Sequence, residues 1–305
     1  RSLAFIRTIG EKTMPPLNFM AAGHGNLGVN SNERVLGTPM SCCLDDEGCL
    51  YVSDTTYHRI MVFNQYTGEA LRTISSQGSL DGFINKPYGI CIDQKQGHVY
   101  VADHHNHRIQ VFNKDSGIFI KTIGYYGTKP GMSPGQFNEP ISVAIDFDST
   151  PNKLYVCDYL NNRVQIFNKD TGMHIGFVGV NMKMNRNSNN NGNSNSNSNS
   201  NGEVRGPRGI YVDHGSKLLI VTERENNYVK IYDKDTNTLV RYFSSDGESS
   251  LPFNRPMELC VNASEGTLLV VDAHNHRIVV MPIEELQDEK YRIQERIKAI
   301  KVAEE

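Results

Sequence analysis

The chain has 305 residues, of which 38% are hydrophobic and 21% charged, enough for one large folded domain or two ordinary ones. No apolar run reaches the roughly 18 residues of a membrane-spanning helix, and the first residues lack the features of a signal peptide. We therefore expect a soluble protein with no membrane partner. The six cysteines lack CxxC spacing, which predicts free thiols in the reducing cytoplasm: Cys42, Cys43, Cys49, Cys91, Cys157 and Cys260.

The formal net charge of −3 is unevenly distributed. Residues 284–305 hold 7 acidic and 5 basic residues, which leaves 27 acidic and 26 basic residues in the rest of the chain. A body this close to neutrality does not favour sequence-independent binding to nucleic acid, which depends on an excess of Lys and Arg. The charge balance therefore favours other classes of partner.

One unit recurs five times along the chain, and its second copy shows the pattern most clearly. This copy opens with Pro and an apolar run that ends in an acid, Pro87–Asp93, and continues with a second run, Val99–Asp103. A short turn leads to Arg108–Phe112, and a last run covers Ile118–Ile123. Four short β-prone runs with turn residues between them, in about 45 residues, are typical of one blade of a β-propeller.

The five copies share a fixed internal spacing. Their opening residues are Pro39, Pro87, Pro140, Pro207 and Pro256. The second run of each copy ends at Asp54, Asp103, Asp158, Glu223 and Asp272. In the first four copies the residue 14 positions after this acid favours a turn, being Gly68, Gly117, Gly172 or Asn237. Since the spacing after this acid is constant and length varies in the loops before it, we predict an all-β fold, a β-propeller of four-stranded blades, of which five are counted.

Side-chain size near the start of each copy fits strands that crowd around a central axis. Two residues after the opening Pro the chain has Ser41, Gly89, Ser142, Gly209 and Glu258. The first four are small, which allows the innermost strands to approach closely. Glu258 departs from this pattern, and we regard it as a candidate carboxylate facing the central channel.

The two ends of the repeat region fit together. The fifth copy stops after its third run, Arg277–Met281, and lacks a fourth. Leu3–Gly10, near the start of the chain, resembles the fourth runs Ala70–Ile74 and Phe119–Ile123. We therefore predict that the N-terminal strand completes the last blade and closes the ring, which removes an open sheet edge.

Two segments lie outside the repeat. Residues 185–201 consist almost entirely of Asn and Ser, cannot bury a core, and are predicted to form a disordered loop between two blades. Residues 283–305 carry apolar residues at alternating spacings of three and four after Pro282, which predicts a charged C-terminal helix. A helix lying on the propeller and a coiled coil between two copies of the chain both fit this pattern. The predicted boundaries are 1–282 for the propeller and 283–305 for the tail.

The repeat resembles a known family. Its second copy, Pro87–Ile123, contains P-x-G-I-x-I-D, V-Y-V-x-D and N-H-R-I-Q-V-F in this order, and on these residues it is similar to the NHL repeat. The resemblance covers about residues 1–282 apart from the gaps between copies. It implies an NHL β-propeller, a fold that usually has six blades.

An acid and an arginine five residues later recur once per copy in four of the five copies. The pairs are Asp54 with Arg59, Asp103 with Arg108, Asp158 with Arg163, and Asp272 with Arg277. A catalytic group is needed only once, so this recurrence indicates a structural role, a charge-assisted bond that fixes a turn or links two blades. The fourth copy has Tyr228 five residues after Glu223, and we predict that it is the weakest blade.

The turns between second and third runs share one edge of a propeller with the gaps between copies. Aromatic, His and Arg side chains gather there, and such residues suit the binding of a protein. The candidate binding residues are Tyr57, Lys86, His104, His105, Tyr159, Arg208, Arg224, Arg255 and His274. No Ser–His–Asp arrangement, nucleophile elbow or phosphate-binding loop occurs in the sequence, so we expect a non-enzymatic scaffold with no cofactor.

Histidines in these turns raise the alternative of a metal site. They lie in the second and fifth copies, and His107 and His276 occupy a regular position of the repeat. We therefore expect no metal there.

The resemblance to the NHL repeat implies three functions. NHL propellers are similar to the substrate-recognition part of RING-type ubiquitin ligases of the tripartite-motif class, which implies a role in protein polyubiquitination and proteasomal degradation. This sequence has no RING cysteine pattern, so ubiquitin transfer requires a RING domain from elsewhere. Similar propellers also bind single-stranded RNA, and a small group are metal-dependent amidating lyases. The neutral body of the chain ranks protein binding above RNA binding.

Overall fold

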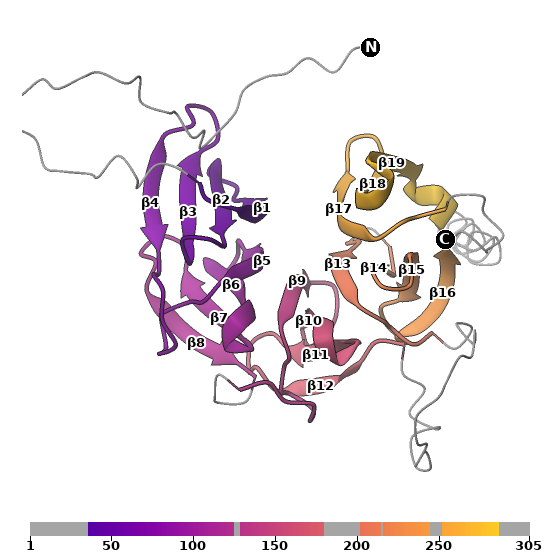
Figure 1. The fold of residues 1–305 in the computed structure, drawn as a ribbon, viewed down its shortest axis with the longest axis horizontal. Helices are drawn as coiled ribbons and strands as arrows, with labels where there is room; N and C mark the ends of the chain where they lie inside the picture. The colour runs from indigo at the N-terminus through magenta and orange to yellow at the C-terminus, as the bar shows by residue number, and fades with distance from the viewer. Residues whose placement is uncertain (1–35, 125–128, 180–201, 215, 245–251, 287–305) are drawn as a thin grey trace, which may run out of the picture. The chain divides into compact units, whose positions relative to one another are not determined.

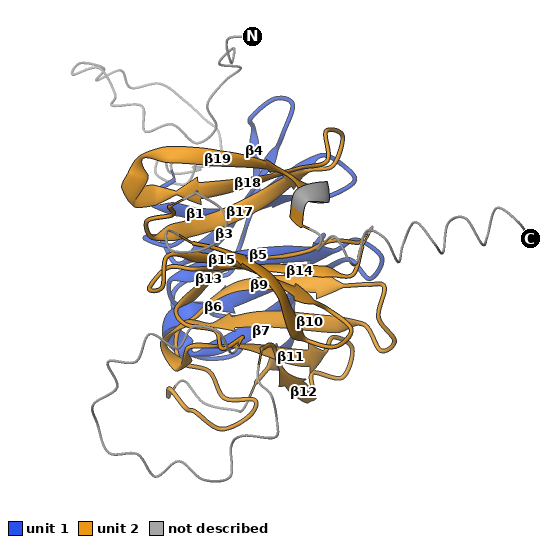
Figure 2. Cartoon of the chain, turned by 90° about the vertical axis from the view of Figure 1, so that its right-hand side faces the viewer, with its two compact units in different colours: residues 1–122 blue, residues 123–305 orange. Residues whose placement is uncertain are grey.

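The computed structural model describes residues 36–124, 129–179, 202–214, 216–244 and 252–286 (Figure 1). Within these ranges the chain is all β, with antiparallel sheets, turns and short 3₁₀ turns but no α-helix. The chain divides into two compact units, residues 1–122 and 123–305, which Figure 2 distinguishes by colour.

The first unit contains two four-stranded antiparallel sheets, and in each sheet neighbouring strands are also neighbours in the sequence. The first sheet consists of β1 (Pro39–Leu44), β2 (Cys49–Asp54), β3 (Arg59–Asn64) and β4 (Ala70–Ile74). The second sheet consists of β5 (Pro87–Asp93), β6 (His98–Asp103), β7 (Arg108–Asn113) and β8 (Phe119–Ile123). These sheets are the first two copies of the repeat.

The second unit contains the other three copies, again with strands in chain order. The third sheet has β9 (Pro140–Asp146), β10 (Lys153–Asp158), β11 (Arg163–Asn168) and β12 (His174–Phe177). The fourth has β13 (Pro207–Val212), β14 (Leu218–Glu223), β15 (Tyr228–Asp233) and β16 (Thr238–Phe243). The fifth has β17 (Pro256–Asn262), β18 (Thr267–Asp272) and β19 (Arg277–Pro282), three strands among the residues that the structure describes.

The strand register explains the fixed spacing of the repeat. In every sheet the opening Pro and the acid that ends the second strand are Cα partners, as Pro87 and Asp103 are in the second. The acid is also the Cα partner of the residue five positions later, as Asp103 is of Arg108. The predicted all-β architecture of five blades, built from four-stranded sheets, is therefore confirmed.

Within each unit the blades pack on one another through apolar side chains. In the first unit a core cluster that includes Tyr51, Ile60 and Val101 joins the first two blades. In the second unit one cluster joins the third and fourth blades, and another joins the fourth and fifth blades around Ile220 and Leu268. Most central strands are thus buried on both faces, which is why Val, Ile, Leu, Tyr and Phe occur at adjacent positions in them instead of alternating with polar residues.

The chain after the fifth blade is described only as far as Leu286. After β19 the chain forms a 3₁₀ turn, Ile283–Leu286, whose Leu286 is fully buried in the cluster of the fourth and fifth blades. The first residues of the predicted C-terminal helix are therefore not α-helical, and its remainder lies outside the described residues. The closing strand at Leu3–Gly10 and the Asn- and Ser-rich loop at 185–201 also lie outside them.

The outer edge of the fifth blade exposes apolar side chains. β19 is the outermost strand of its sheet among the described residues, and its Ile278 and Val280 are exposed.

The described residues include no helix with the length and apolar character needed to cross a membrane.

Candidate functional site

Each blade has two ends, which we name by their loops. The upper edge is the turn between the second and third strands together with the loop that enters the first strand. The lower edge is formed by the turn between the first and second strands and the turn between the third and fourth. Eight of the nine candidate binding residues lie at upper edges, and the ninth, Arg208, is the second residue of β13.

A buried carboxylate organises the upper edge of the second blade. Asp103 accepts hydrogen bonds from Arg108 Nε at 2.8 Å and from the backbone N–H of Asn85 at 2.6 Å. The amides of Asn106 and Gln110 donate to Asp103 Oδ2 at 2.9 and 2.8 Å. Burial raises the pKa of Asp103, although these donors oppose the rise. The carboxylate therefore joins the loop that enters the blade to the turn beyond its second strand.

The other arginines predicted to pair with an acid make the same contact. In the third blade Asp158 accepts from Arg163 Nε at 2.7 Å and from the Asn138 backbone at 2.7 Å, and burial raises its pKa. The remaining pairs are Arg59 Nε with Asp54 Oδ2 at 3.1 Å and Arg277 Nε with Asp272 Oδ2 at 2.8 Å. All four aspartates are fully buried, so in each pair the arginine replaces hydrogen bonds to water that the carboxylate loses on burial.

The same arginines hold the loop that enters their own blade. Arg108 Nη2 donates to the carbonyls of Leu80 at 2.8 Å and Phe83 at 2.9 Å. Arg163 Nη1 donates to the carbonyl of Met132 at 2.6 Å. The side chains of Leu80 and Met132 are 73% and 76% exposed. The buried ion pairs therefore fix backbone segments whose apolar side chains lie in solvent, a feature that the repeat spacing did not reveal.

The fourth blade obtains its cation from another position. Tyr228 replaces the arginine, but Lys230 Nζ lies 3.0 Å from Glu223 Oε1 and 5.6 Å from the centroid of the Tyr228 ring. Burial raises the pKa of Glu223, and the charge of Lys230 opposes the rise. Lys230 was not predicted as a partner of Glu223, because in the other copies the cation stands at the fifth residue after the acid. The signal was a lysine at the seventh residue, where the second and third copies have glutamine.

A second contact links the upper edges of consecutive blades. The ring nitrogen Nδ1 of His58, in the turn of the first blade, accepts from the backbone N–H of Lys86 at 3.0 Å. The corresponding contacts in the second unit are Asn162 Oδ1 with the Gly206 N–H at 2.8 Å, and Asn227 Oδ1 with the Arg255 N–H at 2.7 Å. All six residues have φ between 50° and 62°, and this left-handed backbone brings the two loops together.

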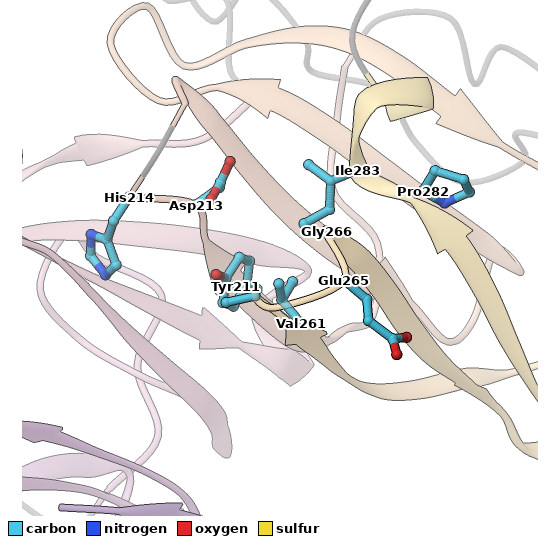
Figure 3. A pocket seen from close by; sticks show the side chains of 9 residues that line it. Tyr211, Asp213, His214, Val261, Glu265, Gly266, Pro282 and Ile283 are labelled. Atoms are coloured by element: carbon cyan, nitrogen blue, oxygen red, sulfur yellow. The ribbon is translucent and has the colours of Figure 1, made fainter. Parts of the chain in front are cut away.

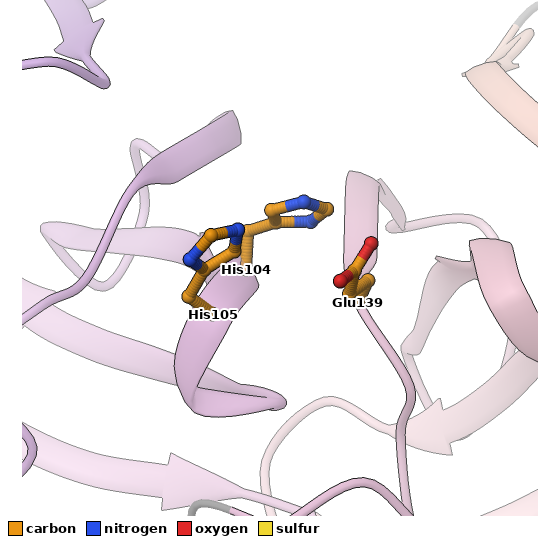
Figure 4. Close-up of side chains that lie close together, drawn as sticks. All are labelled: His104, His105 and Glu139. Atoms are coloured by element: carbon orange, nitrogen blue, oxygen red, sulfur yellow. The ribbon is translucent and has the colours of Figure 1, made fainter.

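The candidate residues of the first unit differ in exposure. Tyr57 is 47% exposed, and Lys86 and His105 are also exposed. His104 is buried, and its ring lies 4.3 Å from that of Tyr88. The same ring stacks on that of His105, with 5.1 Å between the centroids; Figure 4 shows the two histidines. His104 therefore supports the exposed His105 ring rather than forming part of the surface.

The second unit brings three polar side chains together. The Tyr159 hydroxyl donates to Glu225 Oε1 at 2.9 Å, and Arg224 Nη1 lies 3.2 Å from that hydroxyl and 2.7 Å from the carboxylate. Burial raises the pKa of Glu225, but Tyr159 and Arg224 outweigh this effect and lower it overall. Arg255 and His274 are exposed on the fifth blade. The Tyr159–Arg224 contact spans two neighbouring upper edges.

Arg208 and Glu258 lie on the first strands of the fourth and fifth blades. Burial raises the pKa of Glu258 to about 7, and the charge of Arg208 opposes the rise. The two strands lie so close together that a Cβ added to Gly209 would be only 2.8 Å from the carbonyl oxygen of Met257. The small residue expected two positions after the opening Pro is thus explained at this junction.

One cluster in the second unit has the side chains of a metal site. Ligand atoms of Asp146, Asp148 and His214 lie within 4.8 Å of one another. The ammonium of Lys234, however, lies 3.2 Å from Asp146 Oδ1 and 2.6 Å from Asp148 Oδ2. A lysine therefore supplies the positive charge that a metal ion would bring.

Comparisons with known proteins agree with this geometry. The family model of the NHL repeat matches residues 85–112 and 253–281, in the second and fifth blades. Among curated proteins, none matches this sequence.

Two solved structures share the fold. The β-propeller domain of Myceliophteria thermophila Cps50 (Swd1) is 7% identical with a TM-score of 0.51, and the match covers 76% of this chain and 62% of that one. Hydrazine synthase from Kuenenia stuttgartiensis is 12% identical with a TM-score of 0.53, covering 85% of this chain and 81% of that one. This chain thus spans less than two thirds of the first structure, and identities this low show the fold alone. The five sheets with strands in chain order and the two solved structures show a β-propeller, and the family model shows NHL repeats in its second and fifth blades.

Proposed function

We propose that this propeller is a non-enzymatic scaffold that binds a partner protein through the upper edges of its blades. The supporting observation is the exposure of apolar side chains on loops whose backbone is fixed by buried ion pairs. Leu80 and Phe83 lie in the loop that enters the second blade, Met132 in the loop that enters the third, and Leu160 in the turn of the third. Phe83 and Leu160 are 42% and 48% exposed.

Fixed loops with apolar side chains are suited to protein binding. Burying one such side chain contributes about 1.5–3 kcal/mol, and a loop that is already ordered loses little conformational entropy on association. Arg and Tyr, which often dominate interface energies, stand at the same edges as Arg255 and Tyr57. These features favour a protein over a nucleic acid, since Arg224 is paired with Glu225 rather than available to a phosphate.

We further propose that the upper edges act as the substrate-recognition part of a RING-type ubiquitin ligase system in the cytoplasm. The resemblance of the repeat to those of the tripartite-motif ligases supports this role. Binding would deliver the partner to polyubiquitination and proteasomal degradation, with ubiquitin transfer by a RING domain outside residues 1–305.

Affinity capture with matched variants tests the proposed function. The upper-edge variants are the double substitutions Leu80→Ser with Phe83→Ser, and Met132→Ser with Leu160→Ser. The control variants are Ile118→Ser and Met173→Ser, at lower-edge turns with exposures of 67% and 69%. We expect proteins captured by the wild type to be lost with the upper-edge variants and retained with the controls.

Two results would contradict the proposal. One is an unchanged set of captured proteins in both upper-edge variants, with folding verified by circular dichroism. The other is tight binding of single-stranded RNA that weakens steeply with salt in a filter assay and is lost with Lys86→Ala and Arg255→Ala, which would favour the RNA-binding alternative. Stoichiometric zinc in the purified protein would support the lyase-like alternative.

A further inference from the structure

A lysine fastens the lower edges of the first two blades. Lys114, in the turn after β7, places its Nζ 3.7 Å from Oδ2 of Asp45, the residue that follows β1, and 2.9 Å from Glu47 Oε1. The Tyr51 hydroxyl donates to the carbonyl of Lys114 at 3.2 Å. An aspartate and a tyrosine of one blade thus hold a lysine of the next, an arrangement that we call the lysine latch.

The same latch joins the third and fourth blades. Lys234 Nζ lies 3.2 Å from Asp146 Oδ1, and the Tyr155 hydroxyl donates to the carbonyl of Lys234 at 3.2 Å. In both latches the aspartate stands six residues after the opening Pro and the lysine eleven residues after the acid that ends the second strand. The ammonium is almost completely buried in each case, so the site is built to hold a positive charge away from water.

The junction between the fourth and fifth blades keeps only the aspartate of the latch. Asp213 stands six residues after Pro207, but the tyrosine position is Ile220 and the lysine position is Ile283. A pocket of about 720 Å³ lies at this point (Figure 3). Its lining includes Tyr211, Asp213 and His214 from the fourth blade, and Val261, Glu265 and Ile283 from the fifth.

We propose that this pocket binds a lysine side chain of a partner protein, whose ammonium takes beside Asp213 the position that Lys234 takes beside Asp146. Val261 and Ile283 provide apolar wall for the four-carbon stem, and Glu265 adds a second carboxylate. A long aliphatic chain ending in a positive charge matches this combination better than a small inorganic cation does.

The neighbours of Asp213 are compatible with an incoming ammonium. Ser216 Oγ donates to Asp213 Oδ2, as Ser149 Oγ donates to Asp146 Oδ2. Asp146 holds its serine and Lys234 at the same time, so the turn serine does not prevent a carboxylate in this position from binding a cation. The Lys234 ammonium donates to the backbone carbonyl of Asp213 at 3.2 Å, so its charge lies near the proposed site. The carboxylates of Asp146 and Asp148 offset this charge and thereby reduce its repulsion of an incoming ammonium.

The experiment uses the blocked peptide acetyl-Gly-Lys-Gly-amide and the same peptide with an Nε-acetylated lysine. Binding is followed by NMR through the methyl signals of Val261 and of Ile283 where it is present. We expect saturable shifts with the lysine peptide at millimolar concentration or below, and a loss of affinity of at least tenfold on Nε-acetylation or in Asp213→Asn.

The matched variants are Ile283→Lys and Ile283→Met. Ile283→Lys places an ammonium of the chain itself at the latch position, so it should abolish binding of the peptide, whereas Ile283→Met, of similar length but uncharged, should retain it. Leu80→Ser with Phe83→Ser should also retain it, which separates this site from the upper edges. The proposal is overturned if no shifts occur up to ten millimolar, if the acetylated peptide binds equally well, or if Ile283→Lys binds as the wild type does.

Discussion

Lys230 places its Nζ 3.0 Å from Oε1 of Glu223, and it thereby gives the fourth blade the buried ion pair that an arginine gives the other four. The lysine comes from within β15, two residues after the position of the arginine. Its side chain fills the place of Gln110 and Gln165, whose amides donate to the aspartates of the second and third blades. The acid is thus the constant part of the upper edge, and the cation reaches it from either of two positions.

Removing this cation should strongly destabilise the protein. We expect Lys230→Met to lower the free energy of unfolding by about 3–5 kcal/mol, because Glu223 is fully buried and would keep an uncompensated charge or have to take up a proton. Urea denaturation measures the loss, and the additional change Glu223→Gln should recover much of it. Lys217→Met, which breaks an exposed pair with Asp235, should cost less than about 1 kcal/mol. Equal losses of unfolding free energy in the two lysine variants would show that the buried pair stabilises the fold no more than the exposed pair does.

Arg108→Lys should loosen the loop that enters the second blade while leaving the sheet intact. A lysine cannot reproduce the forked contacts to Asp103, Leu80 and Phe83, because it has one nitrogen where arginine has three. We expect hydrogen exchange at the backbone amides of Phe83 and Ile84 to accelerate at least tenfold. Mass spectrometry of exchanged peptides measures this rate.

The control for this loop is Asp81→Asn, which changes only the exposed partner of Arg108. Its exchange rates should remain close to those of the wild type. Unchanged protection in Arg108→Lys would mean that the loop is held by contacts other than the guanidinium.

Gly209→Ala should be destabilising because of the close approach of β13 and β17. The new Cβ would lie 2.8 Å from the carbonyl oxygen of Met257 and 3.1 Å from Cα of Glu258, both backbone atoms that cannot move independently of the sheet. We expect a loss of about 1–3 kcal/mol in thermal or urea unfolding. At Gly176, in β12, a Cβ would meet nothing within 4 Å, so Gly176→Ala should be neutral or slightly stabilising. A similar cost at both glycines would exclude the close approach as the cause.

Glu258 should make stability fall as the pH rises from 4.5 to 7. Burial raises its pKa in the folded protein to about 7 from an ordinary 4.5, so the folded state binds the proton more tightly than the unfolded state does. The contribution of Glu258 to stability is then greatest below pH 4.5 and decreases until the folded carboxyl has ionised, by about 3 kcal/mol at most. Glu258→Gln should match the wild type at pH 4 and exceed it above pH 7.

The comparison for this pH effect is Glu225→Gln, where the sign is opposite. The pKa of Glu225 is lowered in the folded state, so its ionised form favours folding, and the variant should lose stability above pH 4.5 rather than gain it. Urea unfolding between pH 4 and 8 gives both curves. Parallel curves for the wild type and Glu258→Gln would show that this carboxyl does not titrate differently in the folded chain.

Much of the fold was predictable because the repeat is a regular hairpin. Asp103 and Arg108 are Cα partners across the turn between β6 and β7, so their spacing of five residues reflects a single local geometry. The apolar runs between such markers predicted the strands for the same reason, since each run is buried on both faces between neighbouring blades.

Other features depend on contacts between copies, which no single copy reveals. Lys114 and Lys234 stand at a regular spacing of eleven from the acid, but their carboxylate partners belong to the preceding blade. Leu80 and Met132 lie in loops of different length, so alignment of the copies predicted nothing about their exposure. The 3₁₀ turn at Ile283–Leu286 forms because Leu286 packs against another blade, which a helical spacing of apolar residues does not anticipate.

The contacts between upper edges have a direction. At each of the three junctions described, the acceptor side chain belongs to the earlier blade and the donor N–H to the later one, as with His58 and Lys86 or Asn227 and Arg255. A ribosome that makes the chain from its N-terminus therefore completes each acceptor before the corresponding donor exists. Within each unit, a new blade can join its predecessor as soon as its entering loop emerges, so the order of synthesis is also an order in which the upper edge can be assembled.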